Sequence, residues 1–367
     1  MKKIFVTEEV NTSRQIEFDI AKALCIILMI FAHCFEEMSE FTDNFDAQPL
    51  YYIVVVVLGV LFGAGIFIGS MGLGITYCRN QEPESFIKRG FRIFCSGYLL
   101  NLLRYTIPFS VLGFLGLMRW KELLWWTIGN DILQFAGLAF ILFGILKKLK
   151  CSDRTIFLIS LGMSIVGSFV RNIDLGNTVI NQQVGHFIGT CDAEFGEETA
   201  CFSLLNWFII VVVSYLYAKK LRHCADTDRY YAIALPVSGV ILGAYMAFAI
   251  PNRFGLLSGD LAEYYVVTTP NAFLLILGMI FATSVYHFAA KLISEKLKAG
   301  IIRISNSLTP IYYAQWIIIS GIISTAASIF NCRDIGTGTV VIIAVIVSVI
   351  SILLGVRCPK RIKKIIS

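Results

Sequence analysis

Charged residues are scarce in this chain of 367 residues, and their scarcity excludes most classes of soluble protein. Asp, Glu, Lys and Arg make up 15% of the sequence, whereas a soluble domain contains about 25%. Apolar residues make up 57%, above the roughly 45–50% of ordinary globular chains. The sequence therefore predicts an integral membrane protein. At about 20 residues per spanning helix, no length remains for a separate soluble domain.

Several motifs that would indicate other functions are also missing. There are only four histidines, and neither a Cys-x-x-Cys nor a His-x-x-x-His pattern occurs, so no metal site is expected. No internal repeat typical of secondary transporters is evident. No small-residue cleavage site follows the first apolar run, which is therefore not a secretory signal peptide. The net charge of +6 is explained by basic residues at one membrane face, and nucleic-acid binding is not expected.

The long apolar runs predict an all-α, polytopic transmembrane helix bundle with about ten spans. Residues 1–17 are predicted to be a cytoplasmic segment, 18–356 the membrane domain and 357–367 a basic cytoplasmic tail. The stretch 105–126 contains a proline and several glycines and is expected to be re-entrant or interfacial. The predicted spans are 18–36, 51–77, 93–108, 128–147, 155–170, 202–218, 230–250, 266–290, 304–328 and 337–356.

The distribution of basic residues predicts the orientation of these spans. With both termini in the cytoplasm, 24 of the 31 Lys and Arg residues lie on the cytoplasmic side, as short cytoplasmic loops require. The longer loops, 36–49, 171–200 and 251–265, then lie outside, and loops of this length are often functional. A compact chain without a targeting segment favours a bacterial plasma membrane.

Three ionisable residues interrupt the first predicted span. Asp19 and Lys22 share a helix face and can pair, and His33 follows about 16 Å further along nearly the same face. Charged groups inside a span face the protein interior or water, although snorkelling at the cytoplasmic entry is an equal alternative for Asp19 and Lys22. A neutral imidazole can accept a proton at physiological pH, so His33 is the candidate general base. A hydrogen-bonded structural histidine is the alternative.

The remaining histidines are weaker candidates for chemistry. His186 lies in an outer loop, and His223 and His287, toward the inner side, are expected to be solvated. Five glycines between positions 63 and 74 follow small-x-x-x-small spacings, which favour close helix packing over a ligand loop. They are Gly63, Gly65, Gly69, Gly72 and Gly74.

Two polar groups at the ends of other spans are candidate binding residues. Lys88, Arg89 and Arg92 begin the third span on the cytoplasmic side, where guanidinium and ammonium groups can bind phosphates. The positive-inside rule explains them equally well. A second group lies near the outer ends of the third and fourth spans, where Arg104 is a candidate countercharge for Asp131 and a structural ion pair is an equal alternative. It comprises Arg104, Asn130, Asp131 and Gln134.

The first helix also carries a resemblance to a known superfamily. The string Arg14-x-x-Glu17-Phe18-Asp19-x-x-Lys22-Ala23-x-x-Ile26-x-Leu28-Met29-x-x-x-x-His33 resembles the first helix of the transmembrane acyltransferases. These include the bacterial acyltransferase-3 proteins and the heparan-alpha-glucosaminide N-acetyltransferase-like proteins. In acyltransferase-3 proteins an Arg or Lys precedes the histidine taken to be catalytic by ten intervening residues, and Lys22 and His33 match that spacing. The segments 63–74 with 86–92, 130–139 and 305–316 resemble the heparan-acetyltransferase-like branch more closely.

Two positions depart from the pattern of these relatives. Gln315 stands where they often have a histidine before a tryptophan, and Lys22-Ala23 stands where they often have Arg-Gly. An amide can hydrogen-bond but cannot carry a proton. A catalytically degenerate member of the family therefore stays an alternative.

The resemblance implies transfer of an acyl group, with acetyl expected, from cytoplasmic acetyl-CoA to a hydroxyl or amine of an outer glycan or lipid-linked sugar. His33 would be the base, with Lys22 and Asp19 along the donor route. Donor phosphates would bind Lys88, Arg89 and Arg92. The acceptor would bind Arg104, Asn130, Asp131, Gln134 and Gln315. A transporter or flippase, in which the same polar residues line a substrate path, is the competing class.

Overall fold

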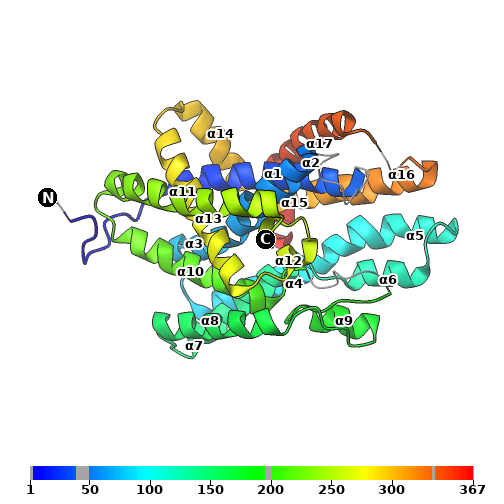
Figure 1. The fold of residues 1–367 in the computed structure, drawn as a ribbon, viewed down its shortest axis with the longest axis horizontal. Helices are drawn as coiled ribbons and strands as arrows, with labels where there is room; N and C mark the ends of the chain where they lie inside the picture. The colour runs from blue at the N-terminus through cyan, green and yellow to red at the C-terminus, as the bar shows by residue number, and fades with distance from the viewer. Residues whose placement is uncertain (1–2, 39–48, 195–200, 333–334, 367) are drawn as a thin grey trace.

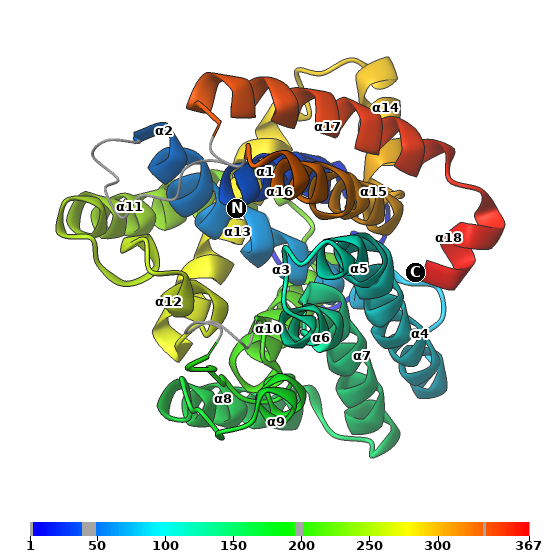
Figure 2. The same ribbon diagram turned by 90° about the vertical axis from the view of Figure 1, so that its right-hand side faces the viewer.

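The chain is almost entirely helical. The computed structural model describes residues 3–38, 49–194, 201–332 and 335–366. It is 78% helical, and no β-strand occurs within the described residues. Most helices run along one common direction (Figure 1), and Figure 2 shows the resulting bundle nearly end-on. The prediction of an all-α helix bundle is therefore confirmed.

The helices follow one another with short connections. Three segments, η1, η2 and η4, are π-helical, and η3 is a 3-10 turn. The elements are α1 Ile16–Met38, α2 Pro49–Tyr51, η1 Tyr52–Ala64, α3 Gly65–Tyr77, α4 Pro83–Asn101, η2 Leu102–Thr106, α5 Ile107–Phe114, α6 Trp120–Ile128, α7 Ile132–Lys148, α8 Asp153–Phe169, α9 Thr178–Val184, α10 Leu204–Arg222, α11 Thr227–Asn252, η3 Gly255–Leu257, α12 Leu261–Tyr265, α13 Thr269–Ala289, α14 Glu295–Ser305, α15 Leu308–Trp316, η4 Ile317–Ser324, α16 Thr325–Phe330, α17 Thr337–Arg357 and α18 Lys360–Ile366.

The helices have the length and surface of membrane spans. Within the described residues, eight helical stretches are long and apolar enough to cross a bilayer. The other two predicted spans correspond to α8, of 17 residues, and to the more polar α4 with η2. The outward faces carry large exposed apolar side chains, such as Val240 on α11, Phe169 on α8 and Ile342 on α17. Water disfavours such a surface, so the chain is a multi-pass membrane protein.

The first helix lies at the centre of the bundle. α1 packs against η1, α3, α13, α14, α15 and α17, so nearly all of its sides are covered. Even its acidic first turn is buried. The buried Glu17 carboxylate accepts a hydrogen bond of 3.0 Å from the Tyr231 hydroxyl. The helix that carries Asp19, Lys22 and His33 is thus held rigidly in the protein interior.

Helix ends differ from the prediction in the third and ninth spans. The predicted 93–108 span begins at Pro83 and continues through η2 and α5 to Phe114, and α6 then returns beside it. The stretch expected to be re-entrant or interfacial is therefore a helical hairpin (Figure 1). Pro108 is tolerated because it follows directly on the π-helical segment η2, where the regular α-helical hydrogen-bond pattern is already interrupted.

The predicted 304–328 span is interrupted near its start. α14 ends at Ser305 and α15 begins at Leu308, and the polar groups of this break bind both ends of the chain. Ser305 donates to Asp19 (2.6 Å), Arg14 donates to Asn306 (2.9 Å), and Lys363 of α18 donates to Ser307 (3.2 Å). The predicted basic tail is thus a helix docked against α4 and α15.

Glycines permit the closest helix contacts, as the small-residue spacing predicted. A Cβ built on Gly72 of α3 would overlap the Val211 carbonyl oxygen of α10, and one on Gly65 would lie 3.1 Å from Leu275 of α13. Gly74, on the same helix, has nothing within 4 Å of such a Cβ. The backbones of α3 and α10 therefore pack directly against each other at Gly72.

This difference between two glycines gives a stability prediction. The substitution Gly72→Ala is expected to destabilise the protein by about 1–3 kcal/mol, since the added methyl meets rigid backbone. Gly74→Ala, in open space on the same helix, is expected to be neutral or slightly stabilising, because alanine is the better helix former. Thermal unfolding of both variants in one detergent tests this pair. Equal midpoints for the two variants would contradict it.

Candidate functional site

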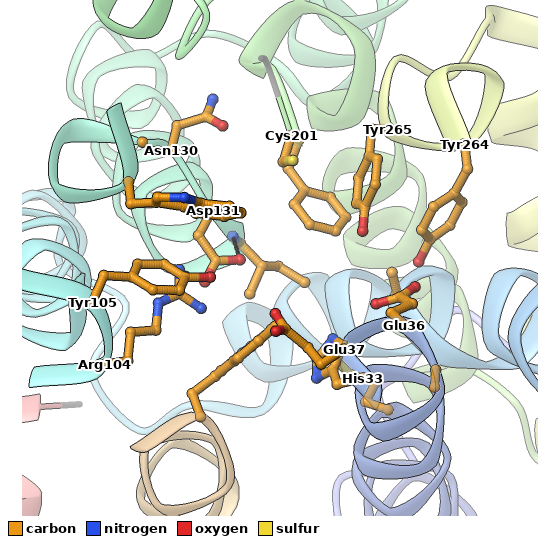
Figure 3. A pocket seen from close by; sticks show the side chains of 18 of the residues that line it. His33, Glu36, Glu37, Arg104, Tyr105, Asn130, Asp131, Cys201, Tyr264 and Tyr265 are labelled. Atoms are coloured by element: carbon orange, nitrogen blue, oxygen red, sulfur yellow. Dashed lines mark hydrogen bonds and ion pairs between the residues drawn. The ribbon is translucent and has the colours of Figure 1, made fainter. Parts of the chain in front are cut away.

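A cavity of about 740 Å³ lies at the end of α1 that is predicted to face the outer side. Figure 3 shows its labelled side chains in three groups. Arg104, Tyr105, Asn130 and Asp131 lie on one side, His33, Glu36 and Glu37 come from α1, and Cys201, Tyr264 and Tyr265 form the third group. The structure thus brings four of the residues predicted from the sequence, His33, Arg104, Asn130 and Asp131, to one cavity.

The last two turns of α1 supply the histidine and two carboxylates. α1 extends to Met38, two residues beyond the predicted span, so Glu36 and Glu37 belong to the helix and not to the outer loop. They lie three and four residues after His33, which places them on the same face one turn further on. Glu37 accepts hydrogen bonds from Ser324 (2.9 Å) and Ser320 (3.4 Å) of η4. Two carboxylates therefore lie one helical turn from His33, the candidate base.

Arg104 and Asp131 form the predicted ion pair. The Arg104 Nη2 lies 2.8 Å from the Asp131 Oδ2, and their side chains are 4% and 12% exposed. Asp131 also accepts a hydrogen bond from the Tyr312 hydroxyl (2.8 Å). It caps α7 by accepting a second one from the Ile132 N–H (2.6 Å). Asn101 accepts from Arg104 (2.9 Å) and donates to the Gly129 carbonyl (2.8 Å). A buried charge pair is stable only when its remaining hydrogen-bonding capacity is used in this way.

Several buried polar atoms around the cavity have no hydrogen-bond partner in the described part of the chain. The donors are Arg104 Nη1 and Trp316 Nε1, and the acceptors are Asn130 Oδ1 and Gln182 Oε1. All four residues line the cavity. Unpaired buried polar groups are costly, so their concentration at one cavity indicates a site that a polar molecule can complete.

Aromatic side chains form much of the remaining wall. Trp125, Trp126, Phe202, Tyr264 and Tyr265 line the cavity, and Trp316 packs between His33 and Arg104. Its ring lies 4.2 Å from that of His33 and 4.6 Å from the Arg104 guanidinium carbon. Such walls bind flat or ring-shaped molecules through their faces and orient them through polar edges.

The π-helical segments gather at this cavity. η1 contributes Val55, Gly59 and Val60 to its wall, η2 contributes Arg104, and η4 begins directly after Trp316. A π-helix widens the backbone and turns side chains away from their α-helical positions, and it is frequent at functional sites. This geometry lets Arg104 and Tyr105, which are adjacent in sequence, both line the cavity.

The residues predicted for donor binding lie outside the described cavity lining. Asp19 does not form the expected ion pair with Lys22: its carboxylate is held by Arg14 (2.6 and 2.7 Å) and Ser305 (2.6 Å). Arg14 lies two residues before the start of α1, and its guanidinium group reaches Asp19 in the first turn. Lys22 lies one turn further along α1, about 16 Å from His33 by helix rise. Lys88, Arg89 and Arg92 are exposed on α4.

Gln134 and Gln315, predicted to bind the acceptor, also lie outside that lining. Gln134 is fully buried against Gly97, and its amide points to the Gly129 carbonyl at 3.5 Å. Gln315 is fully buried on α15, and its Nε2 lies 3.3 Å from the His33 Nδ1. Both amides are thus buried among the packed helices and do not face the cavity.

Two of the other histidines are packed more tightly than expected. His287, expected to be solvated, stacks on Tyr231 (4.4 Å) and bonds Asp228 (2.8 Å), because α11 covers it. His186 is buried between Tyr98 and the Gln182 carbonyl. Burial lowers the pKa of the His186 imidazole, so it stays neutral and holds the segment that carries Gln182.

The fold and the cavity define a polytopic membrane protein with a buried histidine site between its helices. A family model described as an acyltransferase domain matches residues 15–357. The chain therefore belongs to the acyltransferase-3 family, and it is a membrane acyltransferase. Among curated proteins and solved structures, the comparisons found no match.

Sequence reasoning missed several residues of the cavity. Glu36 and Glu37 were assigned to a loop, although their spacing from His33 would have placed them on the same helix face. Tyr312 and Trp316 lie on α15, and nothing in their local sequence shows which side chains they meet. Their contacts with Asp131 and His33 depend on tertiary packing.

Proposed function

We propose that the protein transfers an acyl group, with acetyl expected, from cytoplasmic acyl-CoA to a hydroxyl or amine of an outer glycan or lipid-linked sugar. The observation that carries this proposal is the cavity in which His33, the Arg104–Asp131 pair and unpaired polar atoms meet aromatic walls. A sugar ring stacks on aromatic faces and hydrogen-bonds through its edges, as these walls and polar groups allow.

The chemistry follows from the residues at the cavity. His33 accepts the proton of the acceptor hydroxyl or amine as that group attacks the thioester carbonyl. The carbon–sulfur bond then breaks, and the sulfur takes up the proton that His33 accepted, so that coenzyme A leaves as the thiol and His33 returns to its neutral form. The free N–H of Arg104 is available to the oxygen on which negative charge develops. Asn130 and Asp131 orient the acceptor.

Donor binding is assigned to the opposite end of α1. Lys22 is half-buried on α1, and no ion-pair or hydrogen-bond partner of its ammonium group occurs among the described residues. Lys88, Arg89 and Arg92 lie exposed on α4 at the same predicted membrane face. These groups would hold the phosphates of coenzyme A, so that its long pantetheine arm extends along α1 toward His33.

The test is release of coenzyme A from radiolabelled acetyl-CoA by the purified protein in nanodiscs. A mixed envelope-glycan extract serves as acceptor, and we expect label to move into the extract. Omitting the extract should reduce coenzyme A release to slow hydrolysis. Absence of turnover with any extract, together with absence of acetyl-CoA binding, would contradict the proposal. That outcome would favour a transporter or a degenerate family member.

A further inference from the structure

The contact between Gln315 and His33 determines which imidazole nitrogen faces the cavity. His33 Nδ1 lies 3.3 Å from the Gln315 amide nitrogen, which leaves Nε2 as the nitrogen available to the cavity that His33 lines. An imidazole can act as a base only through a nitrogen that carries no proton. Nε2 is therefore the basic nitrogen only if Nδ1 carries the proton.

The amide of Gln315 can adopt two orientations in the same space. In one orientation the amide N–H of Gln315 donates to Nδ1 of His33. The neutral imidazole must then hold its proton on its own Nε2. With the amide turned over, its Oε1 accepts the proton of Nδ1–H and leaves Nε2 of the ring basic. The amide oxygen and nitrogen are nearly identical in shape, so neither orientation requires movement of the surrounding helices.

Protonation of His33 favours the second orientation during reaction. Its side chain is fully buried, and the Oε1 has no hydrogen-bond partner in the described part of the chain. Turning the amide would give this oxygen the Nδ1–H as its partner, and the amide NH2 would then take the position without a partner. When His33 accepts a second proton, both ring nitrogens become donors, and Oε1 is then the acceptor that the Nδ1–H requires. The ring of Trp316, the next residue, packs against the imidazole with 4.2 Å between the ring centres and restricts its rotation.

We propose that Gln315 is a positioning residue that selects the Nδ1–H tautomer of His33 through its amide carbonyl. This role differs from the acceptor contact predicted for Gln315, because its side chain lies behind the imidazole. The catalytic consequence rests on the proposed function, whereas the tautomer preference itself does not.

The direct test is ¹⁵N NMR of the full-length protein labelled with ring-¹⁵N histidine. The His33 signals are identified by their loss in His33→Gln. We expect Nδ1–H in the wild type and in Gln315→Glu, whose carboxylate also accepts, and we expect Nε2–H in Gln315→Leu. Gln134→Leu removes another fully buried amide and is expected to leave the His33 tautomer unchanged. An unchanged tautomer in Gln315→Leu would overturn the proposal whether or not the protein is active.

Kinetics then separates positioning from substrate binding. Gln315→Leu is expected to lower kcat about tenfold or more at an unchanged acceptor KM, since the ring loses the bond that orients it. Gln315→Glu should retain most of kcat and move the acid limb of the pH profile to higher pH. A raised KM with unchanged kcat in Gln315→Leu would overturn the positioning role. If Gln315→Leu changes the His33 tautomer while the wild-type protein shows no turnover, the positioning role of Gln315 is retained and the proposed function is rejected.

Discussion

Replacing His33 with alanine is expected to reduce acyl transfer by about 10²–10⁴-fold, the usual contribution of a general base. His33 lies at the cavity beside Glu36 and Glu37 and stacks on Trp316. His223→Ala is the matched control, because His223 bonds a backbone carbonyl far from the cavity, at the turn after α10. Both variants are compared by coenzyme A release and by their thermal midpoints.

The pH profile gives an independent measure of the same role. A base must be unprotonated to act, so the rate is expected to be lost as pH falls through the range in which His33 gains a proton. The profile of the wild type should therefore show an acid limb that reports protonation of His33. Residual turnover in His33→Ala should lack that limb. Near wild-type turnover in His33→Ala would remove His33 from the mechanism.

Breaking the Arg104–Asp131 pair is expected to cost about 3–5 kcal/mol of stability when only Asp131 is replaced. Asp131→Ala leaves the guanidinium buried without its countercharge. It also removes the acceptor for the Tyr312 hydroxyl and the cap of α7. The lowered unfolding temperature of this variant tests the first part of the prediction.

A double substitution separates structure from catalysis at this pair. Arg104→Met combined with Asp131→Ala removes both charges, so much of the lost stability should return. Turnover should not return, because the free N–H of Arg104 is gone as well. Full activity in a stable double variant would show that the pair is only structural. Arg119→Met is a suitable control, since that side chain forms exposed ion pairs with Glu122 and Glu194.

The general architecture could be predicted from the sequence, because the length of an apolar run depends only on neighbouring residues in the chain. The helix class, the membrane location and the pairing of Arg104 with Asp131 followed from composition and from the cost of charge in a bilayer. Helix ends were less accessible. Pro108 looked like an interruption, but the helix continues through it because the π-helical segment directly before it accommodates the missing N–H.

The residues of the cavity were only partly accessible, since they come from segments far apart in the sequence. His33 stands out as a polar residue in an apolar helix. Tyr312 and Trp316 do not stand out, although they contact the two key groups of the site. Asp19 was matched with Lys22 because three-residue spacing permits the contact. Its partners are instead Arg14, which precedes the helix, and Ser305, which reaches it by tertiary packing.

The break between α14 and α15 has a consequence for how the chain is assembled. Its bonds join residues separated by 286 and 292 positions, Asp19 with Ser305 and Arg14 with Asn306, and it is also contacted by Lys363. Contacts of such long sequence separation form late, because a large loop must close first. The first helix to be synthesised thus forms these polar contacts only after α14 and the break that follows it have been synthesised. Until then, Asp19 depends on Arg14 alone.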